Sequence, residues 1–314
     1  MPEPQTAART GLQRTRGRRL QPDQGHRQGA DPLVRRRRRH ERGLAFPARS
    51  RQQDLLRGHR PAGVPRRTAE ARQVITRGTT VALALIGGWC LSLVLLLAFG
   101  PSLPPVAWLP AVLLRTLLQT GLFIVGHDAM HRSVVPASQR LNDRVGRVAL
   151  TLYACLPYAL CRRNHLLHHR GPGSSRDPDF HAPRQPGIVG WFVRFLGGYL
   201  SLTSLTVLVA LWGGAALAAG ALHGHGLQVV FSFCTLPLAL SSLQLFLFGT
   251  YLPHRGRAQA SPHGAITLAW PEPLSLLACY HFGYHVEHHS HPSLPWYELP
   301  ACHRRLRQQS GLAA

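Results

Sequence analysis

Apolar residues gather in four long runs after residue 78, separated by polar segments of very different length. A helix needs about 20 apolar residues to cross the hydrocarbon core of a bilayer, and each run is long enough. The runs cover residues 79–100, 104–126, 198–222 and 226–252. This pattern predicts an all-α fold, an integral membrane helical bundle with about four transmembrane helices.

Two of the runs contain an interruption. Arg115 lies inside the second run, and because a charge in hydrocarbon is costly, we expect it to face the bundle or to mark an interface. Pro237 lies inside the fourth run and predicts a kink. A shorter apolar run at 266–282 contains two prolines, which favours an interfacial or re-entrant segment over a further span.

The positive charge is concentrated ahead of the first run. The formal net charge is +23, every basic residue is arginine, and residues 1–78 hold 20 of the 36 arginines. This segment has no apolar periodicity and cannot bury enough apolar surface to offset its ordering entropy. It also lacks the apolar stretch of a secretory signal peptide. We therefore predict two parts: a disordered arginine-rich extension at 1–78 and a membrane domain at 79–314.

Three interpretations of residues 1–78 are open. Arginine runs attract phosphate, so the segment could be an arm that binds nucleic acid or anionic lipid. It could also be a solvated tail without a specific partner. The third interpretation is a mis-assigned start, with the true start near Val74. We favour the last two, and no nucleic-acid partner is expected.

The arginines of the loops predict an orientation in the membrane. The links at 101–104 and 223–225 contain none, whereas 127–197 and the residues after 252 contain many. Loops rich in arginine stay on the cytoplasmic side. Both termini and both large polar segments, which carry the dense histidine clusters, are therefore expected to be cytoplasmic.

Three clusters of histidine follow the apolar runs. They are His127 and His131 in HDAMH, His165, His168 and His169 in HLLHH, and His285, His288 and His289 in HVEHH. Residues three and four apart share one face of a helix, so each cluster directs its imidazoles into a narrow sector. A lone H-x-x-x-H usually binds no metal, but three clusters at membrane boundaries on one side indicate a metal site. Eight imidazoles are more than one metal ion can bind, which predicts a pair of metal ions.

The rest of the composition narrows the choice of metal ion and of site. Neither H-E-x-x-H nor H-x-x-E-H occurs, so the zinc protease patterns fail. The six cysteines are scattered without a C-x-x-C pair, which supports neither a disulfide framework nor a zinc ribbon. Carboxylates are too few after residue 78 for the Glu-rich site of soluble di-iron bundles. A histidine-rich di-iron site remains possible, with no catalytic residue beyond the metal ligands.

The order of these motifs resembles a known family. HDAMH, HLLHHRGPGSSRDPDFH, FGTYLPHR and YHFGYHVEHHSHPSLPWYELP follow one another as in the fatty-acid desaturase superfamily. DPDFH, FGTYLPHR and CYHFGYHVEHH followed by PWYELP are similar to the bacterial β-carotene ketolases of the membrane di-iron type. The resemblance covers roughly residues 80 to 305, and residues 1–78 have no counterpart in it.

The resemblance implies an O2-dependent oxygenase with two Fe ions held by the box histidines. Two successive hydroxylations at C4 of a β-ionone ring would give a geminal diol that loses water to leave a ketone, taking β-carotene to echinenone and canthaxanthin. Reduced ferredoxin or a similar electron-transfer protein would supply electrons. The partners implied are a carotenoid substrate, that carrier and membrane lipid.

Other functions are also compatible with the clusters. A carotenoid hydroxylase or an acyl-lipid desaturase of the same superfamily would carry the same boxes. A non-catalytic metal-binding membrane protein, such as a transporter or sensor, is the alternative from a different class. Transporters place polar ligands near the bilayer midplane, whereas these histidines lie at the ends of the spans.

Further residues are expected around the metals. His254, just after the fourth span, and His281, one helical turn before His285, are candidates to complete the ligand set or to hydrogen-bond to it. Five residues are expected to orient the imidazoles through hydrogen bonds: Asp128, Asp177, Asp179, His181 and Glu287. His223 and His225 are expected in a loop on the opposite side, and His291 and His303 in solvent.

Several aromatic residues near the boxes could line a channel for a long polyene. They are Tyr153, Phe180, Trp191, Tyr251, Trp270, Phe282, Tyr284 and Trp296. An interfacial aromatic belt explains tryptophan and tyrosine equally well, and we favour it for Trp270 and Trp296.

Overall fold

The computed structural model is helical throughout the part of the chain that it describes. The described ranges are 67–180, 187–256, 261 and 263–309, with side chains from Arg77 onward. Every regular element in these ranges is a helix, which confirms the predicted all-helical class. Most of the predicted extension, residues 1–66, lies outside the described residues.

Four helical stretches are long and apolar enough to cross a membrane, as predicted. The first three are α3 (Arg67–Phe99), which continues into the 3-10 turn η1 (Gly100–Ser102), α4 (Pro105–Met130) and α8 (Leu202–His223). The fourth is built from the successive segments α9 (Gly226–Val230), η2 (Phe231–Thr235), α10 (Leu236–Gln244), η3 (Leu245–Tyr251) and α11 (Leu252–His254). Of these, η2 and η3 are π-helical turns.

The second span is the central one. Within its most apolar 18 residues, 56% of α4 is buried inside the protein, against 6% for the corresponding stretch of the first span. α4 packs against α3, α10 and α5 (Gln139–Ala154). Leu91 and Val94 of α3 are 61% and 64% exposed, as expected of side chains that face lipid. The outer surface of the bundle is therefore apolar and its polar residues face inward.

Arg115 of α4 faces the bundle, as the sequence predicted for a charge inside a span, and is fully buried. Its Nε donates to the carbonyl oxygen of Phe233 and its Nη1 to that of Trp89. The guanidinium also lies over the Trp89 ring, 4.8 Å from its centroid. The kink expected at Pro237 coincides with a π-helical turn, η2, that ends two residues before it.

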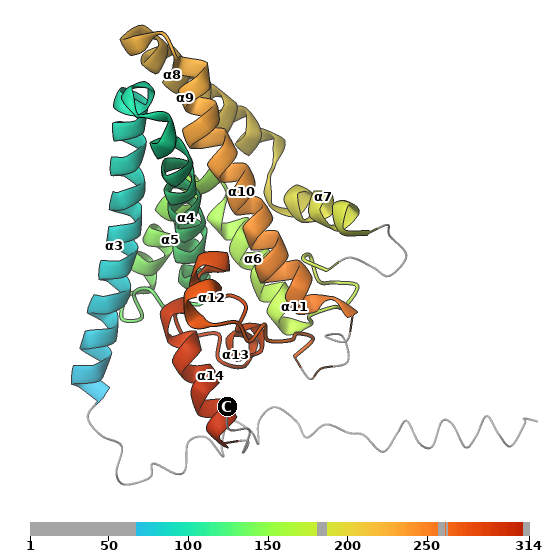
Figure 1. Ribbon diagram of the computed structural model, residues 1–314. Helices are drawn as coiled ribbons and strands as arrows, with labels where there is room; N and C mark the ends of the chain where they lie inside the picture. The colour runs from blue at the N-terminus through green and yellow to red at the C-terminus, as the bar shows by residue number, and fades with distance from the viewer. Residues whose placement is uncertain (1–66, 181–186, 257–260, 262, 310–314) are drawn as a thin grey trace, which may run out of the picture. The chain divides into compact units, whose positions relative to one another are not determined.

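The remaining helices lie toward one end of the spans. They are α6 (Tyr158–Arg170), α7 (Gly187–Tyr199), α12 (Glu272–Cys279), α13 (His285–Ser290), the 3-10 turn η5 (Trp296–Glu298) and α14 (Leu299–Gln309). Figure 1 shows α12, α13 and α14 at the end opposite the α8–α9 link. α12 has eight residues and is too short to span, in agreement with the interfacial segment expected at 266–282.

Close packing fixes α5 and α6 against the end of α4. A Cβ at Gly146 of α5 would overlap the Tyr158 ring and lie 2.8 Å from the Ala129 Cβ, so only glycine allows this approach. Tyr158, the first residue of α6, donates its hydroxyl to the Ala129 carbonyl at 2.9 Å. The start of α6 is thereby anchored beside the last turn of α4, where the first histidine cluster lies.

Candidate metal centre

Nine histidines from four separate stretches of chain converge at this end of the bundle. They come from the end of α4 (His127, His131), from α6 (His165, His168, His169), from α11 (His254) and from α13 (His285, His288, His289). Most of these side chains are buried or half-buried within the protein rather than in solvent. The nine form two groups, and each group could hold one metal ion.

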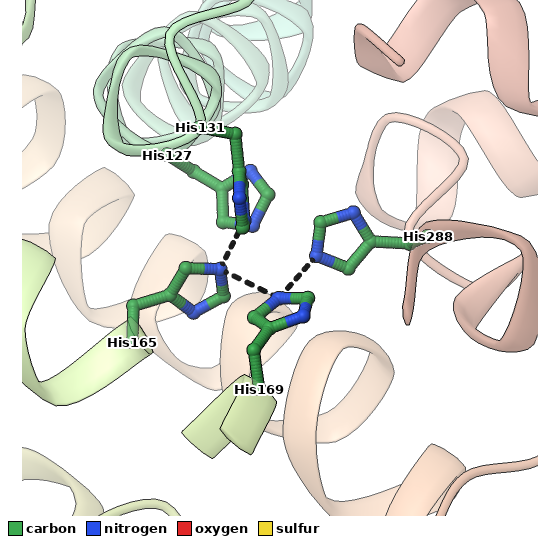
Figure 2. Close-up of side chains that lie close together, drawn as sticks. All are labelled: His127, His131, His165, His169 and His288. Carbon is green, nitrogen blue, oxygen red and sulfur yellow. Dashed lines mark hydrogen bonds between the residues drawn. The ribbon is translucent and has the colours of Figure 1, made fainter. Parts of the chain in front are cut away.

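The first group contains five imidazoles: His127, His131, His165, His169 and His288. One ring nitrogen from each lies within 4.8 Å of all the others. Figure 2 shows the rings pointing toward one another, with Nε2 separations of 2.7 Å for His131–His165, 3.1 Å for His165–His169 and 2.9 Å for His169–His288. The Nε2 of His127 is buried and has no hydrogen-bond partner among the residues that the structure describes.

The second group contains four imidazoles: His168, His254, His285 and His289. Its Nε2 separations are 2.8 Å for His254–His285, 3.1 Å for His285–His289 and 3.1 Å for His168–His289. His254 therefore joins the box histidines from the end of the fourth span, where the sequence placed it as a candidate.

The proton positions in the second group favour a cation between the rings. His254 Nδ1 lies 2.7 Å from the Gly264 carbonyl and His285 Nδ1 lies 3.2 Å from the Phe282 carbonyl. A carbonyl only accepts, so both Nδ1 atoms carry the proton and both Nε2 atoms of the neutral rings present lone pairs. Two lone pairs 2.8 Å apart repel, and a metal ion between them removes the repulsion.

Burial favours the neutral form that binds metal in the histidines of α6 and α13 other than His168, where the hydrogen bond to Asp177 outweighs burial and raises the pKa. Burial, and then the neighbouring His254, hold the pKa of His285 well below its usual value. The same effect of burial, helped by Arg162, lowers the pKa of His131 to about 4. Nitrogens on one ion at right angles, with bonds of about 2.1 Å, stand about 3 Å apart, which matches the observed separations. Imidazole suits iron, copper and zinc, so the donor set fits iron.

Two carboxylates contact imidazole rings of the two groups through Nδ1. Asp177 accepts from His168 Nδ1 at 3.0 Å and from the backbone of Gly173 and Asp179 at 2.9 Å. Burial opposes the charge of Asp177, but these hydrogen bonds outweigh it and lower its pKa. Asp128 Oδ1 lies 3.2 Å from His127 Nδ1, and its other oxygen accepts from the Trp296 backbone N–H.

Two other expected residues, Glu287 and His281, lie differently, and a third is not described. Glu287 points away from both groups and accepts from Thr267 at 2.5 Å and from His303 at 2.6 Å. His281 is buried but belongs to neither group, because its ring stacks on Trp296 with centroids 6.0 Å apart. His181 lies outside the described residues.

The expectation that His303 is solvated is wrong. Its side chain is 16% exposed and it tethers α14 to α13 through Glu287. No periodicity marks such a contact, because the two residues belong to separate helices. At the other end of the bundle, His223 is the last residue of α8 rather than the loop residue predicted, and it contacts the Leu97 carbonyl. His225 is exposed in the link after α8, as expected.

Two spaces lie next to each other beside the histidines. A small chamber of about 40 Å³ is lined by rings of both groups, among them His127 and His285. A larger cavity of about 240 Å³ lies among α4, α5, α7, α8 and the fourth span. Both spaces are lined by the same four residues, which form their junction: Phe123, Phe195, Tyr199 and Leu245.

Only part of the expected aromatic channel lines these spaces. Tyr153 lines the larger cavity and Phe282 the chamber. Phe180 and Trp191 instead pack on Phe246 in a core of their own. Three of the four junction residues are aromatic and were missed by sequence reasoning, because the orientation of α7 depends on packing rather than on local pattern.

Comparison with known proteins defines the class of this chain. The family model for fatty acid desaturase matches residues 102–206 and 199–313. The chain therefore belongs to the fatty acid desaturase family.

Named relatives narrow the group within that family. A beta-carotene ketolase of Paracoccus sp. is 44% identical over 192 residues, covering 59% of this chain and 75% of that protein. Beta-carotene 4-ketolase 3 of Haematococcus lacustris is 34% identical over 261 residues, covering 73% and 79%. Zeaxanthin 4-ketolase of Chlamydomonas reinhardtii is 38% identical over 237 residues, covering 74% and 52%. The group is that of the beta-carotene ketolases, as the motifs predicted.

Proposed function

We propose that this protein is a carotenoid 4-ketolase, an O2-dependent oxygenase that introduces a keto group at C4 of β-ionone rings. Its products from β-carotene would be echinenone and canthaxanthin. The proposal rests on one observation: two groups of imidazoles lie beside an apolar cavity in the bundle. The ketolase names of the relatives support the same substrate class.

Two Fe ions are the proposed cofactor, one in each imidazole group. The facing lone pairs of His254 and His285 support a cation in the second group. The buried, unpartnered Nε2 of His127 supports one in the first. When bound, the iron pair supplies the O2-activating redox chemistry that side chains alone lack. Electrons would come from reduced ferredoxin or a similar carrier.

The protein's own residues hold the ligands and the substrate. Asp128 and Asp177 fix the rings of His127 and His168 through Nδ1, which leaves the other nitrogen of each ring free for metal. The apolar cavity accommodates part of a polyene, and the junction leads one ring toward the histidines. Each of the two hydroxylations at C4 consumes one O2, two electrons and two protons and releases one water. The resulting geminal diol then loses water to give the ketone.

We further infer that the metal centre faces the cytoplasm. All nine histidines lie at the end of the bundle that carries the arginine-rich segments 127–197 and 255–307. The opposite links contain no arginine, and positively charged loops remain on the cytoplasmic side. Within this proposal, residues 79–314 form the catalytic domain.

The test is to express the gene in a β-carotene-producing bacterium and to analyse extracted pigments with iron, O2 and reductant available. Echinenone and canthaxanthin are expected. His288→Ala should abolish both while the protein still inserts in the membrane. His225→Ala is the matched control, because His225 is exposed at the opposite end of the bundle.

Other products would identify another function. Zeaxanthin-type alcohols would indicate a carotenoid hydroxylase, and newly unsaturated lipids an acyl-lipid desaturase. Absence of all of these, together with bound metal and no O2 consumption, would indicate a non-catalytic metal-binding protein.

A further inference from the structure

The junction between the cavity and the chamber contains one polar group. Phe123, Phe195 and Leu245 are apolar, and Tyr199 alone brings an oxygen to the place that both spaces share. Tyr199 is the last residue of α7, and its ring packs on Phe195 with centroids 5.4 Å apart. A substrate ring that enters the chamber from the side of the larger cavity would therefore lie close to Tyr199.

The Tyr199 hydroxyl is held by Asp179. It donates to Asp179 Oδ1 at 2.5 Å, and Asp179 also lines the chamber. The backbone of Asp179 is fixed on both sides, because its N–H donates to Asp177 and its carbonyl accepts from the Trp191 indole. With its proton committed, Tyr199 presents oxygen lone pairs, and Asp179 retains a second carboxylate oxygen.

We propose that Tyr199 and Asp179 together accept a hydrogen bond from the hydroxyl of carotenoid rings that are hydroxylated at C3, and so determine how well such rings are ketolated. The inference rests on the proposed function and concerns the substrate class of the same site.

The chemistry of the ring places its hydroxyl in reach of this pair. The oxygen on C3 is two bonds from C4, so a ring with C4 at the histidines carries its hydroxyl into the same chamber. The chamber is lined by four imidazoles of the two groups, by apolar residues, and by Asp179, Tyr199 and Thr250, so a hydroxyl there needs an acceptor other than the imidazoles. An unmodified β-ionone ring has no such requirement, so the pair affects the two substrates differently.

The test compares two bacterial strains, one that makes β-carotene and one that makes zeaxanthin. Each expresses the wild type, Tyr199→Phe or Thr250→Val, and the fraction of ketolated rings is measured per amount of membrane-inserted protein. Tyr199→Phe should lower ketolation of zeaxanthin roughly tenfold relative to that of β-carotene, since one hydrogen bond to a buried hydroxyl is lost. Thr250→Val removes a hydroxyl elsewhere in the same chamber and should leave the ratio unchanged.

Three outcomes would overturn the inference. They are an equal fall for both substrates in Tyr199→Phe, a ratio that moves only in Thr250→Val, and a wild type that ketolates β-carotene but not zeaxanthin. A wild type that ketolates neither would instead overturn the proposed function.

A second variant guards against loss of folding. If Tyr199→Phe is absent from the membrane, Asp179→Ala replaces it, because alanine removes both acceptor oxygens of the carboxylate without adding bulk. The same fall in the ratio is expected, and an unchanged ratio in this variant contradicts the proposal.

Discussion

Arg115 Nε donates a 3.0 Å hydrogen bond to the carbonyl oxygen of Phe233, which joins the second transmembrane span to the fourth. In a regular helix the Phe233 carbonyl would accept from the backbone of residue 237, but Pro237 has no N–H. The buried charge of one span therefore satisfies the acceptor that the proline of another leaves free. Arg115 and Pro237 interrupt two separate apolar runs in the sequence, and the Phe233 carbonyl links them in the structure.

This relationship predicts a specific coupling between two mutations. Arg115→Met should destabilise the protein by about 2 kcal/mol, because the Phe233 and Trp89 carbonyls lose a buried donor. In a Pro237→Ala background the loss should be smaller, since the alanine introduced there has a backbone N–H that can donate to the Phe233 carbonyl. Thermal unfolding in detergent of the two single variants and the double variant measures the coupling. Additive effects would show that Pro237 and Arg115 act independently.

Asp177 and Glu287 should differ in their effect on iron. Asp177→Asn removes the carboxylate that orients His168, so iron affinity should fall about 10- to 100-fold. Glu287→Gln should keep its iron, because Glu287 contacts Thr267 and His303 rather than a ligand ring. Metal analysis of the two purified variants after dialysis against a graded chelator provides the comparison. Equal losses of iron would contradict the difference between them.

Removal of metal should loosen the end of the fourth span. Without a cation the lone pairs of His254 and His285 face each other, and the repulsion favours separation of α11 from α13. Chelation should therefore lower the thermal midpoint and increase amide hydrogen exchange around residues 252–256 and 285–290, and added Fe(II) should reverse both. Exchange in the link at 223–225 serves as the internal reference. An unchanged midpoint after complete metal removal would count against a structural role for the ions.

Narrowing the junction should block the substrate without unfolding the protein. Leu245 is 4% exposed and lines both the cavity and the chamber, whereas Leu243 on the same span is 41% exposed. Leu245→Phe should reduce ketone formation severalfold at equal protein abundance, and Leu243→Phe should not. Pigment analysis beside immunoblotting of membranes distinguishes a closed passage from poor folding. A similar reduction in both variants would place the passage elsewhere.

The spans were predictable because apolar runs report directly on the bilayer. The box histidines adjoin the ends of those runs or follow them. For the same reason they could be expected to lie at the same end of the bundle. His254 was identifiable by its position after the fourth span. The environment of His281 was not, because its place against Trp296 depends on the path of the chain after α12.

Contacts between elements that are far apart in the sequence could not be predicted from the local sequence pattern. His303 looks like an ordinary polar residue of α14, and only packing of α14 against α13 brings it to Glu287. Likewise the three aromatic residues of the junction belong to α4 and α7, and the rotation of α7 about its axis decides which side chains it presents. Arg115 could be assigned to the bundle interior from its charge, but its acceptor 118 residues away could not.

The division of ligands between helices has a consequence for biosynthesis. Both imidazole groups include residues of α13, which is translated after all four spans, so under the proposed function neither group would have its full set of imidazoles until α13 has been made. Any messenger or ribosomal failure that stops translation before His285 yields a membrane-embedded product that lacks ligands in both sites. Capture of the proposed metal ions would therefore follow synthesis of all four spans, and it would distinguish chains that contain α13 from chains that stop before it.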